Sequence, residues 1–274
     1  MRINKEGFIR SLILLGFSAL LFWLMRSNNI IFYINPRYER LTEIAAIIIF
    51  IMFLAQAGSS LRRSAFDHSR SNFSQDIIKL AYLPFLLTLA MAFLLPNSAL
   101  DANLAANKGM NLSTQPATTV QSGSANTTYD SAAPIAPQAQ SPAQEQIDEI
   151  RKAGLIKVTE ENFTIVNKET YMFPEQYAGK EITMLGFVFK EQGMPSNQFV
   201  LGRYIITCCS ADASLGGFLC EYGNTADFKE GSWLIIRGII KTGKYNDSTV
   251  PIITINSFSP AEEPQNPYIY PVYY

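Results

Sequence analysis

The sequence has a single histidine, His68, among its 274 residues. Activated serine or cysteine nucleophiles usually depend on a neighbouring histidine, and the HExxH zinc motif needs two. The chain beyond His68 has none, so neither arrangement can be built there. The glycine patterns GxGxxG and GxxxxGK[ST], which bind dinucleotides and phosphates, are absent as well. We therefore expect a protein that is not an enzyme.

Cysteine and charge are also scarce. The three cysteines, Cys208, Cys209 and Cys220, are too few for a disulfide framework, although they permit one bridge or a small metal site. From residue 145 onward there are eleven basic and sixteen acidic residues, a balance of −5. An acidic domain is poorly suited to a phosphate backbone, which is bound through Lys and Arg. We therefore expect no nucleic acid partner.

Three long apolar stretches lie in the first part of the chain, residues 1–96. They cover residues 7–25, 41–57 and 77–95, and each is long enough for a helix that crosses a bilayer. The first follows a basic start, as in a signal peptide, but its exit at 24–29 offers no small-x-small cleavage site. We expect three transmembrane helices in the cell membrane, in contact with the lipid bilayer.

Basic residues in the short loops predict the orientation of these helices. Seven Lys or Arg residues lie at the N-terminus and in the second loop, against three in the first loop. Because basic loops stay in the cytoplasm, the N-terminus is predicted to be cytoplasmic. With three spans, everything after residue 96 is then extracytoplasmic.

Residues 97–144 differ sharply in composition. From 113 to 144 the chain is built from Ser, Thr, Ala, Gln, Pro, Gly and Asn with few apolar residues, and Asp130 is its one charge. Such a segment buries too little apolar surface to offset the entropy of ordering. We interpret 97–144 as a disordered linker.

Residues 145–262 show the alternation of a β-rich domain. A short helix is expected at 142–153, and strands at 163–166, 182–189, 199–209, 218–222, 232–241 and 250–258. Gly186 and Gly238 lie inside strands, where a small barrel would bend. We predict an all-β domain, an OB-fold-like small barrel, with a β-sandwich as the alternative. The last residues, 263–274, form an aromatic tail, for which an unstructured end is favoured over an interaction segment.

The chemically reactive side chains gather between Arg203 and Asp212. If Cys208 and Cys209 continue the preceding strand, their side chains point to opposite faces, whereas a turn after Thr207 would bring both sulfurs to one side. Three interpretations stay open: a buried thiol pair or structural disulfide, a redox-active pair, and a soft-metal site for zinc or copper(I). The ligands of the metal site would be Cys208, Cys209, Asp212 and Cys220.

The C-terminal part resembles a family of bacterial membrane proteins labelled as permease subunits. The residues that carry the resemblance are Gly179-Lys180, Gly186-Phe187-Val188, Arg203-Tyr204, Thr207-Cys208-Cys209, Ala211-Asp212, Gly231-x-Trp233 and Gly238. The Cys-Cys-x-x-Asp element is the most specific of them, and Cys220 is not part of it. The resemblance implies a separate polytopic permease as partner and a link with zinc homeostasis.

We therefore predict an accessory subunit of a membrane permease. Its outer β domain would bind a substrate or a metal ion such as zinc, or gate the partner, through Cys208, Cys209 and Asp212. One alternative is an extracytoplasmic thiol-disulfide oxidoreductase that uses the two adjacent cysteines. Another is an envelope-binding interaction module in which aromatic side chains stack on a ligand, namely Tyr204, Phe218, Tyr222 and Trp233.

Overall fold

The computed structural model describes residues 5–62, 72–95, 99–100, 142–245 and 248–271. The chain separates into two compact units. One comprises Met1–Ala99 together with Cys208–Ser210, and the other comprises Leu100–Thr207 and Ala211–Tyr274. Most of the predicted linker, residues 101–141, lies outside the described residues.

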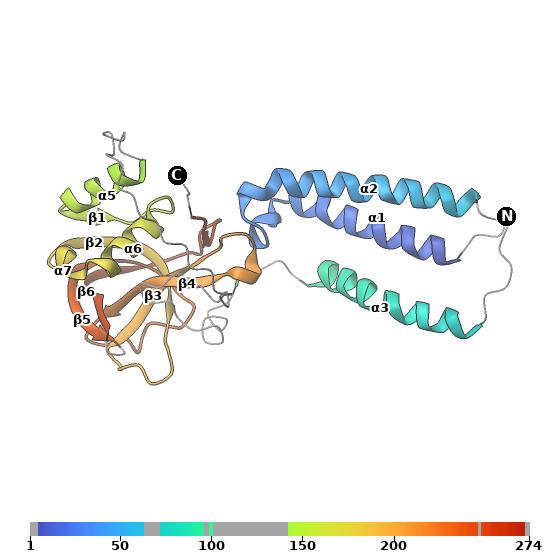
Figure 1. Cartoon of the computed structure of the whole chain (residues 1–274). Helices are drawn as coiled ribbons and strands as arrows, with labels where there is room; N and C mark the ends of the chain where they lie inside the picture. Colours follow the sequence, from blue (N-terminus) through green and yellow to red (C-terminus); the bar gives the residue numbers. More distant parts are fainter. Residues whose placement is uncertain (1–4, 63–71, 96–98, 101–141, 246–247, 272–274) are drawn as a thin grey trace, which may run out of the picture. The chain divides into compact units, whose positions relative to one another are not determined.

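The first unit is helical. Helices α1 (Lys5–Arg26) and α2 (Glu39–Arg62) run side by side (Figure 1) and are joined through two 3-10 helices, η1 (Asn29–Phe32) and η2 (Pro36–Tyr38). Helix α3 (Asn72–Leu94) contacts α1. The expected apolar helical N-terminal part is confirmed, because Gly7–Arg26 and Pro36–Ser59 are long and apolar enough to cross a membrane. In α3 the described apolar part, Tyr82–Leu94, is shorter, so the third span stays a prediction.

Small residues line the contacts between these helices. Ser18 of α1 is buried against α2, where its hydroxyl donates to the carbonyl of the buried Ala46 at 3.2 Å. Gly16 of α1 faces α3, and a Cβ atom there would lie 2.3 Å from Leu89 Cδ2. Close approach over small side chains is typical of helix packing in a bilayer, where water provides no driving force.

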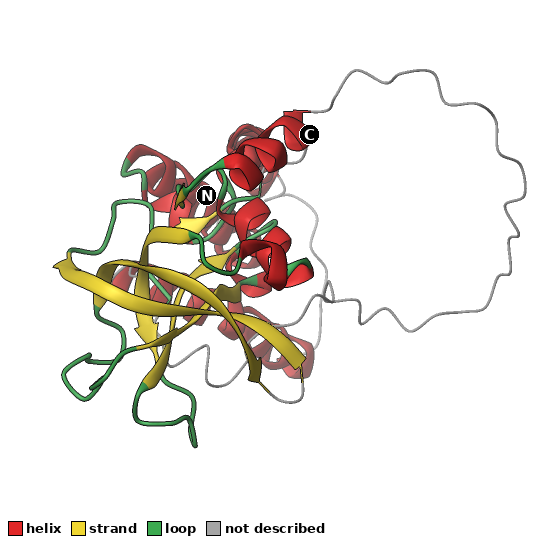
Figure 2. Ribbon diagram, turned by 90° about the vertical axis from the view of Figure 1, so that its left-hand side faces the viewer, coloured by secondary structure: helices red, strands yellow, loops and turns green. Residues whose placement is uncertain are grey.

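The second unit contains a mixed sheet, with seven strands in the described residues. In sheet order the neighbours are β1 (Leu155–Lys157), β2 (Glu181–Phe189), β5 (Trp233–Tyr245), β6 (Ser248–Ala261), β4 (Ser214–Glu221), β3 (Gln198–Ile205) and β7 (Tyr268–Ile269). Three pairs are parallel, β1–β2, β4–β6 and β3–β7, and the other pairs are antiparallel. Strand β2 also pairs with β3. Figure 2 shows these strands, in yellow, as long and curved ribbons.

The β-rich character is confirmed, but the prediction of an all-β domain is wrong. Helices α5 (Pro142–Lys152), α6 (Phe163–Met172) and α7 (Pro174–Tyr177) accompany the sheet, and only α5 was expected. The predicted strand at 163–166 is the start of α6. Phe163, Val166 and Thr170 are buried there, which is the spacing of a helix face. A four-residue window is too short to tell that period from a buried strand.

Glycines let β2, β3 and β4 approach closely. A Cβ atom on Gly217 would lie 2.3 Å from the Leu201 carbonyl oxygen, and one on Gly186 would lie 2.8 Å from the Gly202 carbonyl oxygen. Gly238 lies at a shift in the pairing of β5 with β6, and its Cβ would meet the Thr254 carbonyl at 2.3 Å. The predicted bends at Gly186 and Gly238 are thus sites where backbone approaches backbone.

The aromatic tail begins inside the fold. Tyr268 and Ile269 form β7, and both side chains are buried, so the expectation of an unstructured end is wrong for these residues. The Tyr268 hydroxyl accepts a hydrogen bond from the backbone N–H of Leu100 at 2.8 Å. The two ends of the second unit are therefore joined, because Leu100 is its first residue.

Candidate functional site

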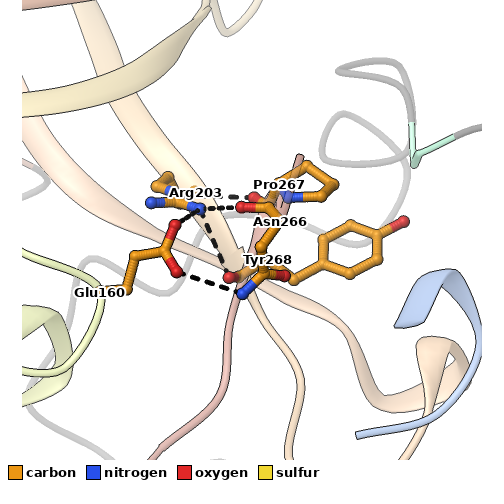
Figure 3. Close-up of polar contacts among 5 residues, drawn as sticks. All are labelled: Glu160, Arg203, Asn266, Pro267 and Tyr268. Carbon is orange, nitrogen blue, oxygen red and sulfur yellow. Dashed lines mark hydrogen bonds and ion pairs between the residues drawn. The ribbon is translucent and has the colours of Figure 1, made fainter. Parts of the chain in front are cut away.

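A buried arginine fixes the end of β3. Arg203 is 3 % exposed, and its Nη2 donates to Glu160 Oε1 at 3.0 Å and to the Asn266 carbonyl (Figure 3). Its Nε donates to the Pro267 carbonyl at 3.3 Å, and Nη2 lies 3.4 Å from the Tyr268 carbonyl. Burial lowers the pKa of Arg203 from its ordinary value while Glu160 opposes that shift, so the side chain stays charged. The Arg203 side chain thus connects β3 to Glu160 and to residues 266–268.

The segment after β3 is held by its own turn. Ile206 is buried and its N–H donates to the Ile269 carbonyl at 2.9 Å. The next N–H, of Thr207, donates to Asp212 Oδ1 at 3.1 Å, and Asp212 ends the 3-10 turn η3 (Ser210–Asp212). The Asp212 carboxylate therefore closes a short loop with Cys208 and Cys209 at its tip. This loop, Thr207–Asp212, is called the cysteine loop below.

The tip of the cysteine loop is hydrogen-bonded to the connection between α1 and α2. The Asn35 N–H donates to the Cys208 carbonyl at 3.0 Å, and the Ser210 N–H donates to the Tyr33 carbonyl at 2.9 Å. Cys209 and Ile34 form an antiparallel β-bridge between these two bonds. Residues Cys208–Ser210 accordingly cluster with the helical unit and not with the sheet.

The strand-like segment Tyr33–Asn35 is positioned by packing. Ile30 is 3 % exposed and clusters with Leu20 and Leu24 of α1. The Ile30 carbonyl accepts from the N–H groups of Tyr33 and Ile34, both at 3.0 Å. The segment that receives the cysteine loop is therefore fixed to the end of α1.

The two adjacent thiols lie together. Cys208 is exposed and Cys209 is partly exposed, and their sulfur atoms are 3.6 Å apart, joined by a weak S–H···S contact and not by a covalent bond. The strand ends at Ile205, so the prediction that it continues to Cys209 is wrong, and a turn brings the sulfurs to one side. The structure thus brings together Cys208 and Cys209, with Asp212 serving as the cap of their loop.

Cys220 belongs to the core. It is fully buried in β4, its register partner on β3 is Phe199 at the far end from the cysteine loop, and its Sγ lies 3.5 Å from the Phe218 carbonyl. Burial raises the pKa of its thiol. Among the described residues no group of three or more His, Cys, Asp or Glu side chains is placed to hold a metal ion. The predicted set of Cys208, Cys209, Asp212 and Cys220 is not assembled, and zinc stays a prediction.

Two of the aromatic side chains that were predicted to stack on a ligand are buried in the core. Tyr204 and Phe218 are 2 % and 0 % exposed, so neither can stack on a ligand as the envelope-binding alternative requires.

Glu160, Asn266 and the 33–35 segment were not identified from the sequence. Arg203 in an otherwise apolar strand was the available signal, because a buried cation requires partners. Nothing in the local sequence of Tyr33–Asn35 indicates a pairing about 175 residues away.

Comparison with known proteins supports the resemblance. Residues 9–111 match the family description "DUF1980 N-terminal domain" and residues 135–271 match "DUF1980 C-terminal domain". The chain is 24 % identical over 283 residues to "UPF0703 protein YcgQ" of Bacillus subtilis, covering 95 % of this chain and 98 % of the relative. It is 26 % identical over 277 residues to the "Putative two-component membrane permease complex subunit" of Streptococcus mutans, covering 97 % and 100 %. The cysteine loop lies within the second matched region, and the chain belongs to the DUF1980 family.

Proposed function

We propose that this protein is an accessory subunit of a two-component membrane permease. The observation that carries the proposal is the similarity along 97 % of the chain to a relative named as a subunit of such a complex. Both parts of the chain, helices and sheet domain, lie within that similarity. The permease itself would be a separate polytopic protein.

The surface of the helical unit supports this proposal. Large apolar side chains on α2 are exposed at helical spacing, with Leu41 at 61 %, Ile44 at 53 %, Ile48 at 51 % and Ile51 at 57 %. An apolar surface of this kind needs lipid or protein around it. Because three spans, the expected number, enclose no channel of their own, the helices are better suited to packing against a permease than to conducting a solute.

The proposed topology places the sheet domain outside the cell. It rests on the seven basic residues of the N-terminus and second loop, against three in the first loop. In this arrangement α3 is the third span. The cysteine loop and the α1–α2 connection would then both lie on the extracytoplasmic side, consistent with their hydrogen bonding to each other.

For the sheet domain we propose an OB-type barrel that binds a substrate or gates the permease. Its support is the set of pairings β2–β5, β5–β6, β6–β4, β4–β3 and β3–β2, which returns to the starting strand with a parallel β4–β6 pair. The end of β3 leads directly into the cysteine loop. That loop is the proposed point of action because it contacts the α1–α2 connection.

Handling of zinc as the transported ion is a second proposal. What supports it is the 3.6 Å separation of the Cys208 and Cys209 sulfurs, close to that of two thiolates bonded at about 2.3 Å to one tetrahedral zinc. Two thiolates are fewer ligands than a resident zinc site needs, so the remaining ligands would come from water or the permease. The thiol-disulfide oxidoreductase alternative also stays open, since both thiols are accessible.

Affinity capture tests the permease proposal. Tagged full-length protein is extracted from membranes in mild detergent, and co-purified proteins are identified by mass spectrometry. A polytopic membrane protein recovered in near-stoichiometric amount is the expected result, and recovery of none overturns the proposal.

Tryptophan substitutions then locate the contact surface. Leu12→Trp, Ile47→Trp and Leu87→Trp each add bulk to an exposed position of one helix. Lipid accommodates the larger ring, whereas a packed interface does not, so at least one variant should lose the partner. Ile235→Trp is the matched control, because Ile235 is 45 % exposed on β5 and Ile47 is 44 % exposed on α2.

A further inference from the structure

The cysteine loop holds two adjacent thiols, Cys208 exposed and Cys209 partly exposed, and both are within reach of small reagents. Their backbone is engaged on either side, through the Cys208 carbonyl and the Ser210 N–H. We propose that Cys208 and Cys209 form a reversible vicinal disulfide, and that its formation releases the cysteine loop from Tyr33–Asn35. This is a regulatory modification site, independent of which partner or substrate the protein has.

The two sulfurs are close enough for a bond to form with little movement. They lie 3.6 Å apart, and a disulfide bond needs about 2.05 Å. Closing this gap requires a movement of roughly 1.5 Å at the loop tip. No second element must approach, because both thiols lie on the same loop.

The disulfide that forms is strained. Adjacent α-carbons are about 3.8 Å apart across a trans peptide, whereas disulfide-linked α-carbons are usually 4.4–6.8 Å apart. A bond between neighbouring cysteines is therefore strained, and strained disulfides are more easily reduced. That property suits a bond that forms and breaks in response to conditions and does not suit a permanent staple.

Formation of the disulfide moves the backbone of the cysteine loop. Two backbone hydrogen bonds flank Cys209: the Asn35 N–H donates to the Cys208 carbonyl, and the Ser210 N–H donates to the Tyr33 carbonyl. The Cys209–Ile34 bridge lies between them. Closing the ring turns the Cys208–Cys209 peptide and moves its carbonyl away from Asn35. At the other end the Ile206 N–H, just before the loop, donates to the Ile269 carbonyl of β7 at 2.9 Å, and Asp212 holds the Thr207 N–H, so the loop cannot shift as a whole to preserve the pairing.

The reaction balances with a small-molecule disulfide as oxidant. The exposed Cys208 thiolate attacks the reagent, forms a mixed disulfide and expels one thiolate. The Cys209 thiolate then attacks the Cys208 sulfur, forms the Cys208–Cys209 bond and expels the second. The two protons lost by the cysteines are taken up by the two released thiolates, and two electrons pass to the reagent.

The test uses full-length protein in detergent, treated with oxidised glutathione and then with dithiothreitol. Peptide mass spectrometry should find the 208–209 peptide lighter by two hydrogens after oxidation and restored after reduction. Hydrogen–deuterium exchange at the amides of Asn35 and Ser210 should accelerate by about tenfold on oxidation, because both lose their acceptors. The Thr207 amide, bonded to Asp212, reports whether the loop has unfolded altogether.

Two variants make the result decisive. Cys208→Ser removes an exposed thiol and should abolish the response of both amides, while Cys220→Ala removes the buried thiol and should leave the response intact. A glutathione adduct that persists on Cys208 would overturn the proposal, since the ring would not have closed. An intramolecular bond with unchanged exchange at Asn35 and Ser210 would overturn it equally. Partner capture is read separately, so failure of the permease proposal leaves these outcomes unaffected.

Discussion

The Arg203 guanidinium lies 3.0 Å from the Glu160 carboxylate, and the two partners differ greatly in exposure, with side chains 4 % and 42 % exposed. The cation is buried, whereas the anion reaches it from the surface. Three main-chain carbonyls of residues 266–268 complete the arginine's hydrogen bonding. Arg203 and its partners therefore join residues 266–268 to β3.

Replacing Arg203 with methionine should loosen the C-terminal segment. The substitution keeps most of the volume but leaves the 266–268 carbonyls without their donor, at a cost of about 3 kcal/mol in the free energy of unfolding. Limited proteolysis after residue 261, with thermal unfolding, measures it. Arg237→Met is the control, because Arg237 makes an exposed pair with Glu181 and its loss should matter far less.

Gly217→Ala should destabilise the sheet domain by about 2 kcal/mol, because the new methyl group would overlap backbone that has no room to move. Its Cβ would lie 2.3 Å from the Leu201 carbonyl oxygen and 2.6 Å from Gly202 Cα. Gly223→Ala has nothing within 4 Å and is the matched control. Denaturant midpoints of the two variants compare them, and equal midpoints would show that β3 and β4 can separate at that point.

Ala46→Leu should separate α1 from α2. Ala46 is fully buried and its carbonyl accepts the Ser18 hydroxyl, so a larger side chain forces the helices apart. Ala45→Leu, one residue earlier on an exposed position of the same helix, adds the same volume without a clash. Thermal aggregation of the detergent-solubilised variants should show a lower midpoint for Ala46→Leu alone.

The proposed topology predicts that Cys208 is labelled in intact cells. A membrane-impermeant maleimide should modify the exposed Cys208 without cell lysis. In the Cys208→Ser, Cys209→Ser, Cys220→Ala background, a cysteine introduced by His68→Cys should require lysis, because the second loop is proposed to be cytoplasmic. The reverse pattern would place the sheet domain in the cytoplasm.

Because the Cys220 thiol is buried, we expect the protein to lose stability at alkaline pH. Burial raises the pKa of its thiol in the folded chain, whereas in the unfolded chain the thiol titrates near pH 8.5. Above that pH the unfolded state gains thiolate and the folded state does not, so the stabilising contribution is present below pH 8.5 and declines above it. The free energy of unfolding should fall by about 1.4 kcal/mol between pH 7 and pH 9.5 from this group.

Comparing the wild type with Cys220→Ala isolates this contribution. The variant should be less stable at pH 7 through lost packing but should show a shallower decline with pH. Unfolding by denaturant, followed through the β4 amides by hydrogen exchange, provides the measurement. Identical slopes would mean that the Cys220 thiol ionises equally well in both states.

Periodicity predicted those parts of the fold that one local pattern determines. The strands around Ile182, Leu234 and Ile253 alternate or are continuously apolar, and they appear within a few residues of their predicted limits. Helix α6 was missed because its buried residues Phe163 and Val166 also suit a strand over four positions. Strand β7 was missed because two residues carry no period at all.

Local sequence patterns predicted the cysteine loop of the candidate site but not the segment that it contacts. The Cys-Cys-x-x-Asp element identified the loop, and Asp212 does act within it, through the Thr207 N–H. The partner segment Tyr33–Asn35 is recognised by backbone hydrogen bonds, which any residue type can make. Cys220 was grouped with the other cysteines by residue type, although its place in β4 directs it to the core.

The hydrogen bond from the Leu100 N–H to the Tyr268 hydroxyl bears on how this chain can change over evolution. Leu100 and helix α5 both belong to the second unit, so insertions or deletions between them change the length of a connection within that unit. Doubling the length of a connection costs only about 0.6 kcal/mol in closure entropy. Changes in the number of residues between Leu100 and α5 should therefore be tolerated, whereas loss of the Tyr268 hydroxyl would remove the acceptor of the Leu100 N–H.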